Sequence, residues 1–106
     1  MNERGLPDVS WHGCQLLRPG WDDPNARAMA FTLAGSGAEA DIHVMLNMDR
    51  EGLDFEIPIV KRRQWYLAVD TAQGAPCDIA EPGREKAILA DHVHVQGRSV
   101  VVLLSR

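Results

Sequence analysis

The histidines are the residues whose spacing first suggests chemistry. His92 and His94 are two positions apart, so on a β-strand both rings would point to one face and could share a metal ion. Two ligands do not complete a tetrahedral zinc site, and no regular spacing places His12 or His43 beside them. We therefore expect His92 and His94 to face solvent on an edge strand, and we predict no metal site.

Carboxylates gather in two regions, and paired carboxylates are what glycoside hydrolysis requires. Asp22 and Asp23 are adjacent, and Asp78, Glu81 and Glu85 follow later. All of them lie in turn-rich segments, where Asp and Asn side chains commonly accept hydrogen bonds from nearby backbone amides. We therefore interpret these acids as turn residues and predict no catalytic pair.

Nucleophilic and nucleotide chemistry are not indicated either. No serine lies in a Gly-x-Ser-x-Gly sequence, and the turn Gly35-Ser36-Gly37 precedes no helix that could cradle a phosphate. Cys14 and Cys77 are far apart and show no metal-ligand pattern, so we expect free thiols. A disulfide between them is the alternative for a secreted context. The sequence thus predicts no catalytic residue and no cofactor.

Aromatic side chains offer a different chemistry, because their faces stack on sugar rings and their polar groups orient hydroxyls. Four residues qualify: Trp11, Trp21, Trp65 and Tyr66. Trp11 and Trp65 fall within predicted strands, where packing in the core or an interface is the expected role, whereas Trp21 lies in a loop. Glucan contact at Trp21, Trp65 or Tyr66 is therefore an alternative that we rank below a structural role.

The composition predicts one globular domain over residues 1–106. Hydrophobic residues make up 45% and charged residues 25% of the chain, which at 106 residues is long enough for a single core. A net charge of −4 lacks the positive field that binds phosphates, so we expect no nucleic-acid partner. No apolar run reaches the roughly 20 residues that cross a bilayer, and the polar start lacks signal-peptide character. We expect no membrane partner and a cytoplasmic location.

Short strands must position these side chains, because no segment repeats apolar residues at helical spacing over ten positions. Alternating or β-branched runs between turn residues predict seven or eight strands. The predicted fold class is all-β, an antiparallel β-sandwich, with a small closed barrel as the alternative. The predicted strands are Val9–Cys14, Ala28–Leu33, Asp41–Met48, Leu53–Ile57, Trp65–Val69, Ala87–Leu89, a strand around Val93 and Val95, and Ser99–Leu104.

Three further predictions concern pairing and burial. Residues 41–48 and 53–57 flank the turn 49–52 and resemble a hairpin. Ile42, Val44, Leu46 and Met48 share one face, and Met45 lies with His43 and Asn47 on the other, which indicates that this second face is partly covered. The β-branched run 99–104 suits a central strand buried on both faces.

Several short motifs are specific when their order and spacing are taken together. They are Val9-Ser10-Trp11-His12-Gly13, Pro19-Gly20-Trp21-Asp22-Asp23-Pro24, Arg27-Ala28-Met29-Ala30-Phe31-Thr32-Leu33, Val44-Met45-Leu46-Asn47-Met48, Leu53-Asp54-Phe55-Glu56-Ile57-Pro58, Trp65 with Val69-Asp70-Thr71, and Gly97-Arg98-Ser99-Val100-Val101-Val102-Leu103. Over nearly the whole chain this order resembles the C-terminal domain of bacterial isoamylase-type glycogen debranching enzymes, members of the α-amylase superfamily. The Trp-His-Gly sequence is most similar to the cyanobacterial form of this enzyme. In that form it replaces the Trp-x-Arg-Pro sequence of other bacterial members.

The resemblance implies a sandwich that packs against the catalytic (β/α)-barrel of a longer enzyme, which hydrolyses α-1,6 branch linkages in glycogen. The family's nucleophilic aspartate, acid glutamate and transition-state aspartate belong to that barrel, so no catalytic residue carries over to this chain. The implied function is a non-catalytic domain that stabilises or packs on the barrel, with binding of glycogen or another α-glucan as the alternative. One departure is the turn after Asn47-Met48, where Asp49-Arg50-Glu51-Gly52 replaces the family's aromatic pair and Glu-Pro.

Overall fold

The computed structural model describes residues 2, 4–75, 78–81 and 85–106, and all regular structure in that part of the chain is β. Each strand coincides with a predicted one to within a few residues at its ends. No helix in the described residues is long and apolar enough to cross a membrane. The strands are β1 (Val9–His12), β2 (Ala28–Leu33), β3 (Ile42–Asn47), β4 (Leu53–Glu56), β5 (Trp65–Asp70), β6 (Lys86–Ala87), β7 (His92–Val95) and β8 (Ser99–Ser105).

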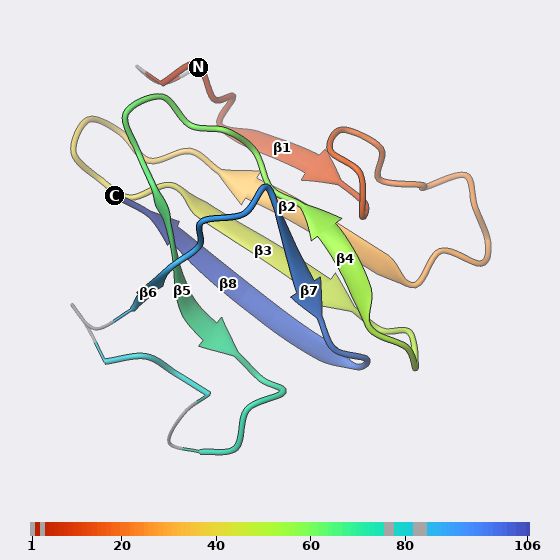
Figure 1. The fold of residues 1–106 in the computed structure, drawn as a ribbon. Coiled ribbons are helices and arrows are strands. Elements are labelled where there is room, and N and C mark those ends of the chain that lie inside the picture. Colours follow the sequence, from red (N-terminus) through yellow and green to blue (C-terminus); the bar gives the residue numbers. More distant parts are fainter. Residues whose placement is uncertain (1, 3, 76–77, 82–84) are drawn as a thin grey trace.

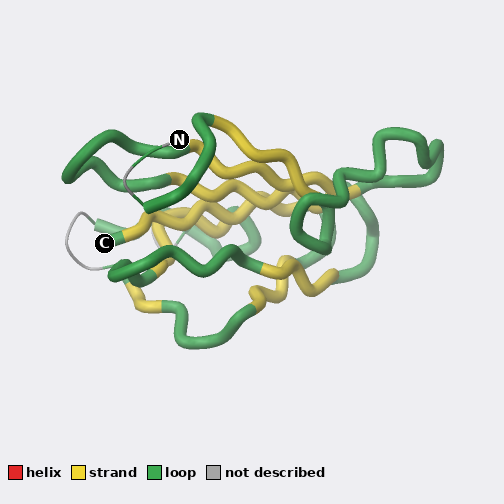
Figure 2. The backbone as a smooth tube through the Cα atoms, turned by 90° about the horizontal axis from the view of Figure 1, so that it is seen from above, coloured by secondary structure: helices red, strands yellow, loops and turns green. Residues whose placement is uncertain are grey.

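The strands form two antiparallel sheets that face each other (Figure 1). The large sheet has the order β1-β2-β3-β8-β5-β6, and β4 pairs with β7 in a two-stranded sheet. Viewed from above, the small sheet lies along one side of the large one (Figure 2). The predicted antiparallel sandwich is confirmed. The alternative of a closed barrel is wrong, because β1 and β6 end the large sheet without pairing with each other.

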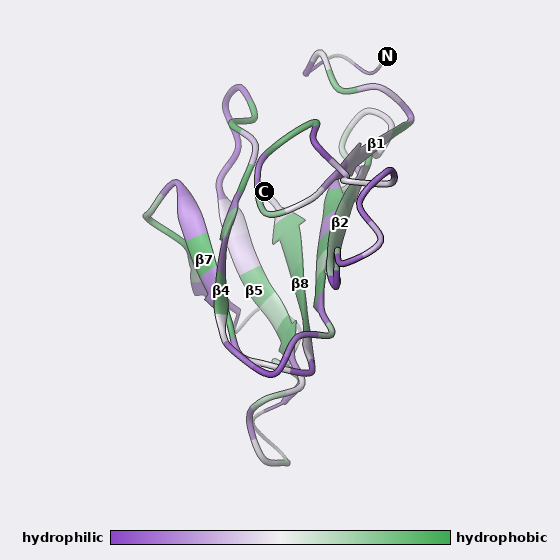
Figure 3. Ribbon diagram, turned by 90° about the vertical axis from the view of Figure 1, so that its right-hand side faces the viewer, coloured by the Kyte–Doolittle hydropathy of each residue, from purple (hydrophilic) through white to green (hydrophobic). Residues whose placement is uncertain are grey.

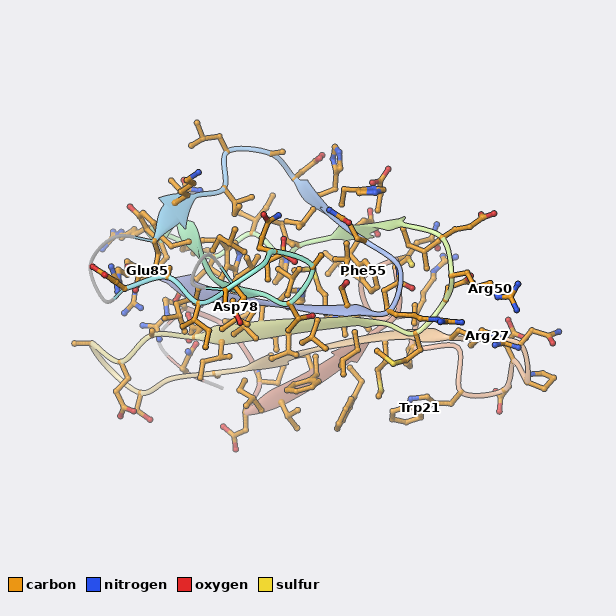
Figure 4. The ribbon with its side chains drawn as sticks, turned by 90° about the horizontal axis from the view of Figure 1, so that it is seen from below. Trp21, Arg27, Arg50, Phe55, Asp78 and Glu85 are labelled. Carbon is orange, nitrogen blue, oxygen red and sulfur yellow. The ribbon has the colours of Figure 1, made fainter. Side chains whose placement is uncertain are left out.

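The hydrophobic core lies between the two sheets. We call the face of the large sheet turned toward β4 and β7 the inner face, and the opposite face the outer face. Met45, Val101 and Leu103 point inward from the large sheet, and Phe55 and Val95 meet them from the small sheet. All five side chains are at most 1% exposed. Figure 4 shows Phe55 between the layers and Trp21 on the far side of the large sheet.

The predicted hairpin between β3 and β4 is wrong. β3 pairs with β2 along one edge and with β8 along the other, so no edge is left for β4, which pairs with β7. Residues 48–52 therefore carry the chain from the large sheet to the small one, and residues 96–98 carry it back. The Asn47 side-chain amide fixes this crossing by donating to the carbonyl oxygen of Val95 at 3.0 Å.

β8 occupies a central position between β3 and β5, as its apolar sequence predicts. In a view along the layers it is apolar over most of its length, whereas β7 alternates with polar residues (Figure 3). Its inner side chains Val101 and Leu103 are buried, but the alternate side chains on the outer face are only half-buried. The prediction that β8 is buried on both faces is therefore correct for the inner face alone.

The irregular stretch after β5 returns along the edge of the large sheet. Val69 and Ile79 form an isolated antiparallel bridge, and the Asp70 amide donates to the carbonyl oxygen of Asp78 at 2.9 Å. Cys77, one of the two predicted free thiols, lies outside the described residues. Cys14 is a free thiol, as predicted.

Candidate functional site

The outer face of the large sheet carries three rows of apolar side chains. Strand register places them side by side, because residues directly opposite each other on paired strands share a face. No second sheet covers this face in the described part of the chain, since β4 and β7 lie on the inner side. The first row is Val9, Leu33, Ile42, Leu104 and Tyr66; the second is Trp11, Phe31, Val44, Val102 and Val69; the third is Met29, Leu46 and Val100.

The margin of the outer face is the most accessible part of it. Val9, Trp11 and Leu33 lie at the β1 edge and are 42%, 39% and 40% exposed. The middle of each row is half-buried, because each side chain is flanked by neighbours on both adjacent strands. Single exposed apolar residues are ordinary on a monomer, but contiguous rows of them mark a contact surface.

An aromatic cluster forms one corner of the outer face. Trp11 packs on Phe31 with ring centroids 5.5 Å apart, and Trp21 meets Trp11 edge-on at 5.9 Å. Trp21 is 68% exposed and lines a hollow of 460 Å³ together with Arg27 and Met29. The arrangement holds a large aromatic ring at the border between the apolar face and polar loop residues.

The three residues of the Trp-His-Gly sequence lie in three different environments. Trp11 points to the outer face, whereas His12 points to the inner face, where it is 3% exposed. Gly13 follows where the chain folds back on itself, and a Cβ added there would lie 2.4 Å from the carbonyl oxygen of Arg18. Any larger residue at position 13 would therefore displace the turn 13–18.

The inner face holds a buried chain of polar side chains. His12 Nε2 lies 2.9 Å from Thr32 Oγ1, which lies 2.8 Å from His43 Nδ1. Burial lowers the pKa of His12, and burial together with the nearby His12 ring lowers the pKa of His43 to about 3. Both rings are therefore neutral at ordinary pH, and this pair offers no charged group for catalysis.

A buried ion pair ties the N-terminal segment to the large sheet. Arg4 Nε donates to Asp41 Oδ2 at 2.7 Å, and the Asp41 side chain is fully buried. Burial alone would raise the pKa of Asp41, but hydrogen bonds from Arg4, the Gly35 amide and Ser105 outweigh it and lower the pKa. The carboxylate is thus a structural anchor, with its acceptor positions occupied.

The structure separates the three predicted glucan-contact residues. Trp65 is 5% exposed, and its Nε1–H donates to the carbonyl oxygen of Pro58 at 2.7 Å, so its ring belongs to the core. Tyr66 is half-buried at the edge of the outer face, with the Arg106 guanidinium 5.7 Å from its ring centroid. Trp21 is the most exposed of the three and lines the 460 Å³ hollow, and glucan contact stays a prediction.

The remaining candidates are spread over the surface. His92 and His94 are exposed on β7, where His94 Nδ1 lies 2.7 Å from Asp54 and His92 Nδ1 lies 2.9 Å from Asp91. Hydrogen bonding to Asp91 raises the pKa of His92. Among the residues that the structure describes, no group of three or more His, Cys, Asp or Glu side chains could hold a metal ion.

The predicted turn role is confirmed for Asp23, whose carboxylate accepts a hydrogen bond from the Asn25 amide at 2.9 Å. Glu85 instead pairs with Arg106 at 2.8 Å near the C-terminal end of β8. Figure 4 places Glu85 and Asp78 toward one end of the molecule and Trp21 toward the other. The two acidic regions are therefore not brought together.

Sequence reasoning did not predict the polar chain or the Arg4–Asp41 pair. The available signal was the alternation in β3, where His43, Met45 and Asn47 share the face opposite the aliphatic residues. A polar residue on the core face is read as solvent-facing unless its partners are known, and those partners lie in distant strands.

Comparison with known proteins identifies the family to which this arrangement belongs. Residues 10–105 match the protein family described as Isoamylase 1-3, C-terminal. Among curated proteins the chain is similar to isoamylase 2, chloroplastic, from rice (Oryza sativa subsp. japonica), with 23% identity over 112 residues. The match covers 95% of this chain but only 14% of the rice protein. Because the family match spans all eight strands apart from one residue at the start of β1, the chain belongs to the isoamylase 1-3 C-terminal domain family.

Proposed function

We propose that this chain is the non-catalytic C-terminal domain of an isoamylase-type debranching enzyme, and that its outer face packs against the catalytic part of that enzyme. The observation that supports the proposal is the three apolar rows on the outer face. A sheet is stable when its apolar face is buried against another layer, and here the second sheet covers only the inner face.

The small share of the rice relative that this chain matches favours the catalytic part of the same enzyme as the segment that covers the outer face. The matched family is a C-terminal domain, and the chain spans only 14% of the length of its rice relative. In a protein of that kind most of the chain precedes this domain and is available to cover its outer face. The domain would supply apolar contact area and no reacting group.

The family resemblance supports a proposal for the activity of the whole enzyme. We propose that the parent protein hydrolyses α-1,6 branch linkages in glycogen through a (β/α)-barrel and works in the cytoplasm. The Trp-His-Gly sequence supports a bacterial, cyanobacterial-like parent. Assay of the parent enzyme on glycogen and on its linear fragments tests this: linear products from glycogen support it, and an absence of branch cleavage contradicts it.

A binding assay tests the docking face. The chain is mixed with the parent enzyme lacking its C-terminal domain, and affinity and recovered activity are measured. Replacing Trp11 and Leu33 by serine should weaken binding by about tenfold or more, because both contribute accessible apolar area to the outer face. The matched control replaces Ile59 and Leu89, which are 92% and 87% exposed but lie in loops beside the small sheet.

The two double variants distinguish docking at the outer face from nonspecific hydrophobic association. The proposal requires that replacing Trp11 and Leu33 weakens binding and that replacing Ile59 and Leu89 does not. Equal losses for both pairs, or no association of the unaltered chain with the truncated enzyme, contradict it.

Glucan binding at Trp21 is the second candidate, favoured by the hollow that its exposed ring lines beside Arg27 and Asp23. An aromatic wall with a few polar groups around it suits a sugar ring. Electrophoresis through a glycogen-containing gel tests this candidate. Retardation that is lost on Trp21→Ala supports it, and migration that is independent of glycogen contradicts it.

A further inference from the structure

The polar chain on the inner face has no part in the docking contact, yet its geometry fixes the position of every proton in it. The backbone N–H of Leu17 donates to His12 Nδ1 at 2.8 Å. His12 Nδ1 is therefore unprotonated, and the neutral ring carries its proton on Nε2. The Nε2-protonated tautomer of His12 is thus assigned from the backbone N–H of Leu17, because an N–H group can only donate a hydrogen bond.

The remaining protons follow in order along the chain. His12 Nε2–H donates to Thr32 Oγ1, so the Thr32 hydroxyl donates its own proton to the other nitrogen that it contacts, His43 Nδ1. Neutral His43 consequently carries its proton on Nε2. This is the nitrogen that has no hydrogen-bond partner among the described residues.

A second proton cannot enter either ring without breaking the chain. The unprotonated nitrogen is Nδ1 in both His12 and His43, and each Nδ1 already accepts a hydrogen bond. Protonation of His12 would set its new N–H against the N–H of Leu17, and two donors repel. Burial opposes the charged form as well, as the lowered pKa of both histidines indicates.

Three contacts tie the turn that Leu17 belongs to: the Leu17 amide donates to His12 Nδ1, the Leu16 amide donates to the Glu56 carboxylate at 3.0 Å, and the Glu56 amide donates to the carbonyl oxygen of Cys14 at 2.8 Å. Leu17 is 73% exposed and has a φ of +61°, a left-handed conformation that costs free energy for a residue with a Cβ. Its side chain therefore contributes little packing, and the bond to His12 links the turn directly to the inner face. Gly13 permits the turn to close against Arg18.

We propose that His12, Thr32 and His43 form a pH-dependent clasp, which holds the turn 13–18 on the core while both rings are neutral and releases the turn when His12 takes a proton. The released turn exposes His12 to water, where the charged ring is stable. Opening is thus favoured by acid, because the open state binds a proton that the closed state rejects.

One carboxylate from the small sheet contacts the turn itself, since Glu56 of β4 accepts the hydrogen bond from the Leu16 amide. His43 faces Thr32 on β2 and Leu103 on β8, and the Trp65 ring of β5 lies 5.7 Å from it. From the small sheet, the core contacts are the apolar residues Phe55 and Val95.

Further titratable or charged side chains border the inner face near the clasp. Cys14 follows β1, and burial together with Asp54 raises the pKa of its thiol, so it stays neutral in acid. Asp41 precedes β3 and is neutralised by its ion pair with Arg4. His43 stays neutral in mild acid because its pKa is about 3, so the clasp assigns the acid response to His12, whose Nδ1 holds the Leu17 amide.

The clasp connects the core to the outer face. The turn 13–18 leads directly through Pro19 and Gly20 to Trp21, which rests on Trp11 at the corner of the docking surface. Release of the turn would therefore loosen Trp21 from that corner. The clasp itself stands without the docking proposal, whereas its effect on docking rests on the proposed function.

Nuclear magnetic resonance of this chain tests the clasp through tautomers and amide exchange. At pH 7.5 we expect His12 and His43 to be protonated on Nε2, and the Leu17 amide to be protected despite its exposed position. The equilibrium constant for opening of the turn, measured by hydrogen exchange of the Leu17 amide, should increase about tenfold for each pH unit below about 6.5. Below that pH a solvent-exposed histidine gains its proton. The Met48 amide, which donates to the carbonyl oxygen of Arg27, is the reference because no histidine takes part in its bond.

A pair of substitutions isolates the hydroxyl in the middle of the chain. Thr32→Val keeps the branched shape and removes the hydroxyl, so it should increase opening of Leu17 at pH 7.5 by roughly tenfold. Thr32→Ser keeps the hydroxyl and should leave Leu17 protected. Equal Leu17 exchange in the two variants overturns the clasp.

Two results on the unaltered chain also overturn the clasp, even if the valine variant fails to fold. The first is a His43 ring that carries its proton on Nδ1. The second is hydrogen exchange of the Leu17 amide with the same pH dependence as that of the Met48 amide. Docking to the truncated enzyme is then compared at pH 7.5 and 5.5. If Leu17 behaves as expected while docking is unchanged, the clasp is upheld and its control of docking is overturned.

Discussion

The buried carboxylate of Asp41 shows how much a single residue can contribute to this fold. Its side chain is fully buried, and the Arg4 side chain that neutralises it is 9% exposed. An ion pair at this depth contributes little net stability compared with apolar residues of similar volume, but removing one partner leaves a buried charge. The pair therefore anchors the N-terminal segment to the start of β3.

Arg4→Met should lower the free energy of unfolding by roughly 3–5 kcal/mol, the usual cost of leaving a buried charge without its partner. Urea denaturation followed by tryptophan fluorescence measures the change. Arg18→Met is the matched control, because Arg18 is exposed and its side chain donates a hydrogen bond to the exposed Gln15 at 3.4 Å, so no buried charge loses its partner. Similar losses in the two variants would contradict the assigned role of the ion pair.

Stability should fall in acid because of His43. Its folded-state pKa of about 3 lies below the ordinary histidine value near 6.5, so the unfolded chain takes up the proton first. The stability present above pH 6.5 is then lost toward pH 3, with a slope approaching about 1.4 kcal/mol per pH unit from this residue.

Urea denaturation at pH 7.5 and 5 measures that slope. His43→Leu should flatten it, whatever the variant does to stability at pH 7.5. His92→Gln should leave the decline in place, because His92 is exposed and its pKa is raised instead of lowered. An equally steep decline in the His43 variant would show that other groups cause the acid sensitivity.

At the scale of the strands, the sequence predicted which side chains share a face, but not which face points to the core. In β3 the aliphatic residues Ile42, Val44 and Leu46 point to the outer face, while His43, Met45 and Asn47 point to the core. A rule that places the more apolar face inside fails here, because the outer face is apolar as well. Two apolar faces on one sheet indicate two contact surfaces.

Neighbouring substitutions in β3 test these directions. Met45→Ala should destabilise the chain by about 2–5 kcal/mol, because Met45 is fully buried between the sheets. Val44→Ala should cost clearly less, since Val44 is half-buried on the outer face with no sheet above it. The difference is measured by urea denaturation, and a larger loss at Val44 would reverse the assignment of the faces.

Strand pairing was the other feature that local patterns could not settle. The segments around the turn 49–52 have the alternation of a hairpin, yet the chain crosses there between sheets because β2 and β8 take both edges of β3. Positions of strands depend on nearby residues and were predicted well. Pairing depends on which distant strands lie beside each other in the assembled sheets, and the same limit applies to the partners of His43 and Asp41.

For the whole molecule, the sandwich and its family were predictable because they rest on the order of many short motifs. For the candidate site, the resemblance implied only that the domain packs on a longer protein, and it did not indicate which face of the domain carries the apolar rows. Its position depends on the assembled large sheet, since each row draws one residue from each of several strands. The exposed apolar margin and the buried polar chain belong to opposite faces of that sheet.

The most direct test of the docking face uses methyl resonances of the two sides of the large sheet. Methyl-labelled chain is recorded alone and with the parent enzyme that lacks its C-terminal domain. We predict that the outer residues Val44, Val102 and Leu104 shift or broaden, while the inner residues Val101 and Leu103 change little. Changes confined to Ile59 and Leu89 beside the small sheet, or no changes at all, would contradict the account.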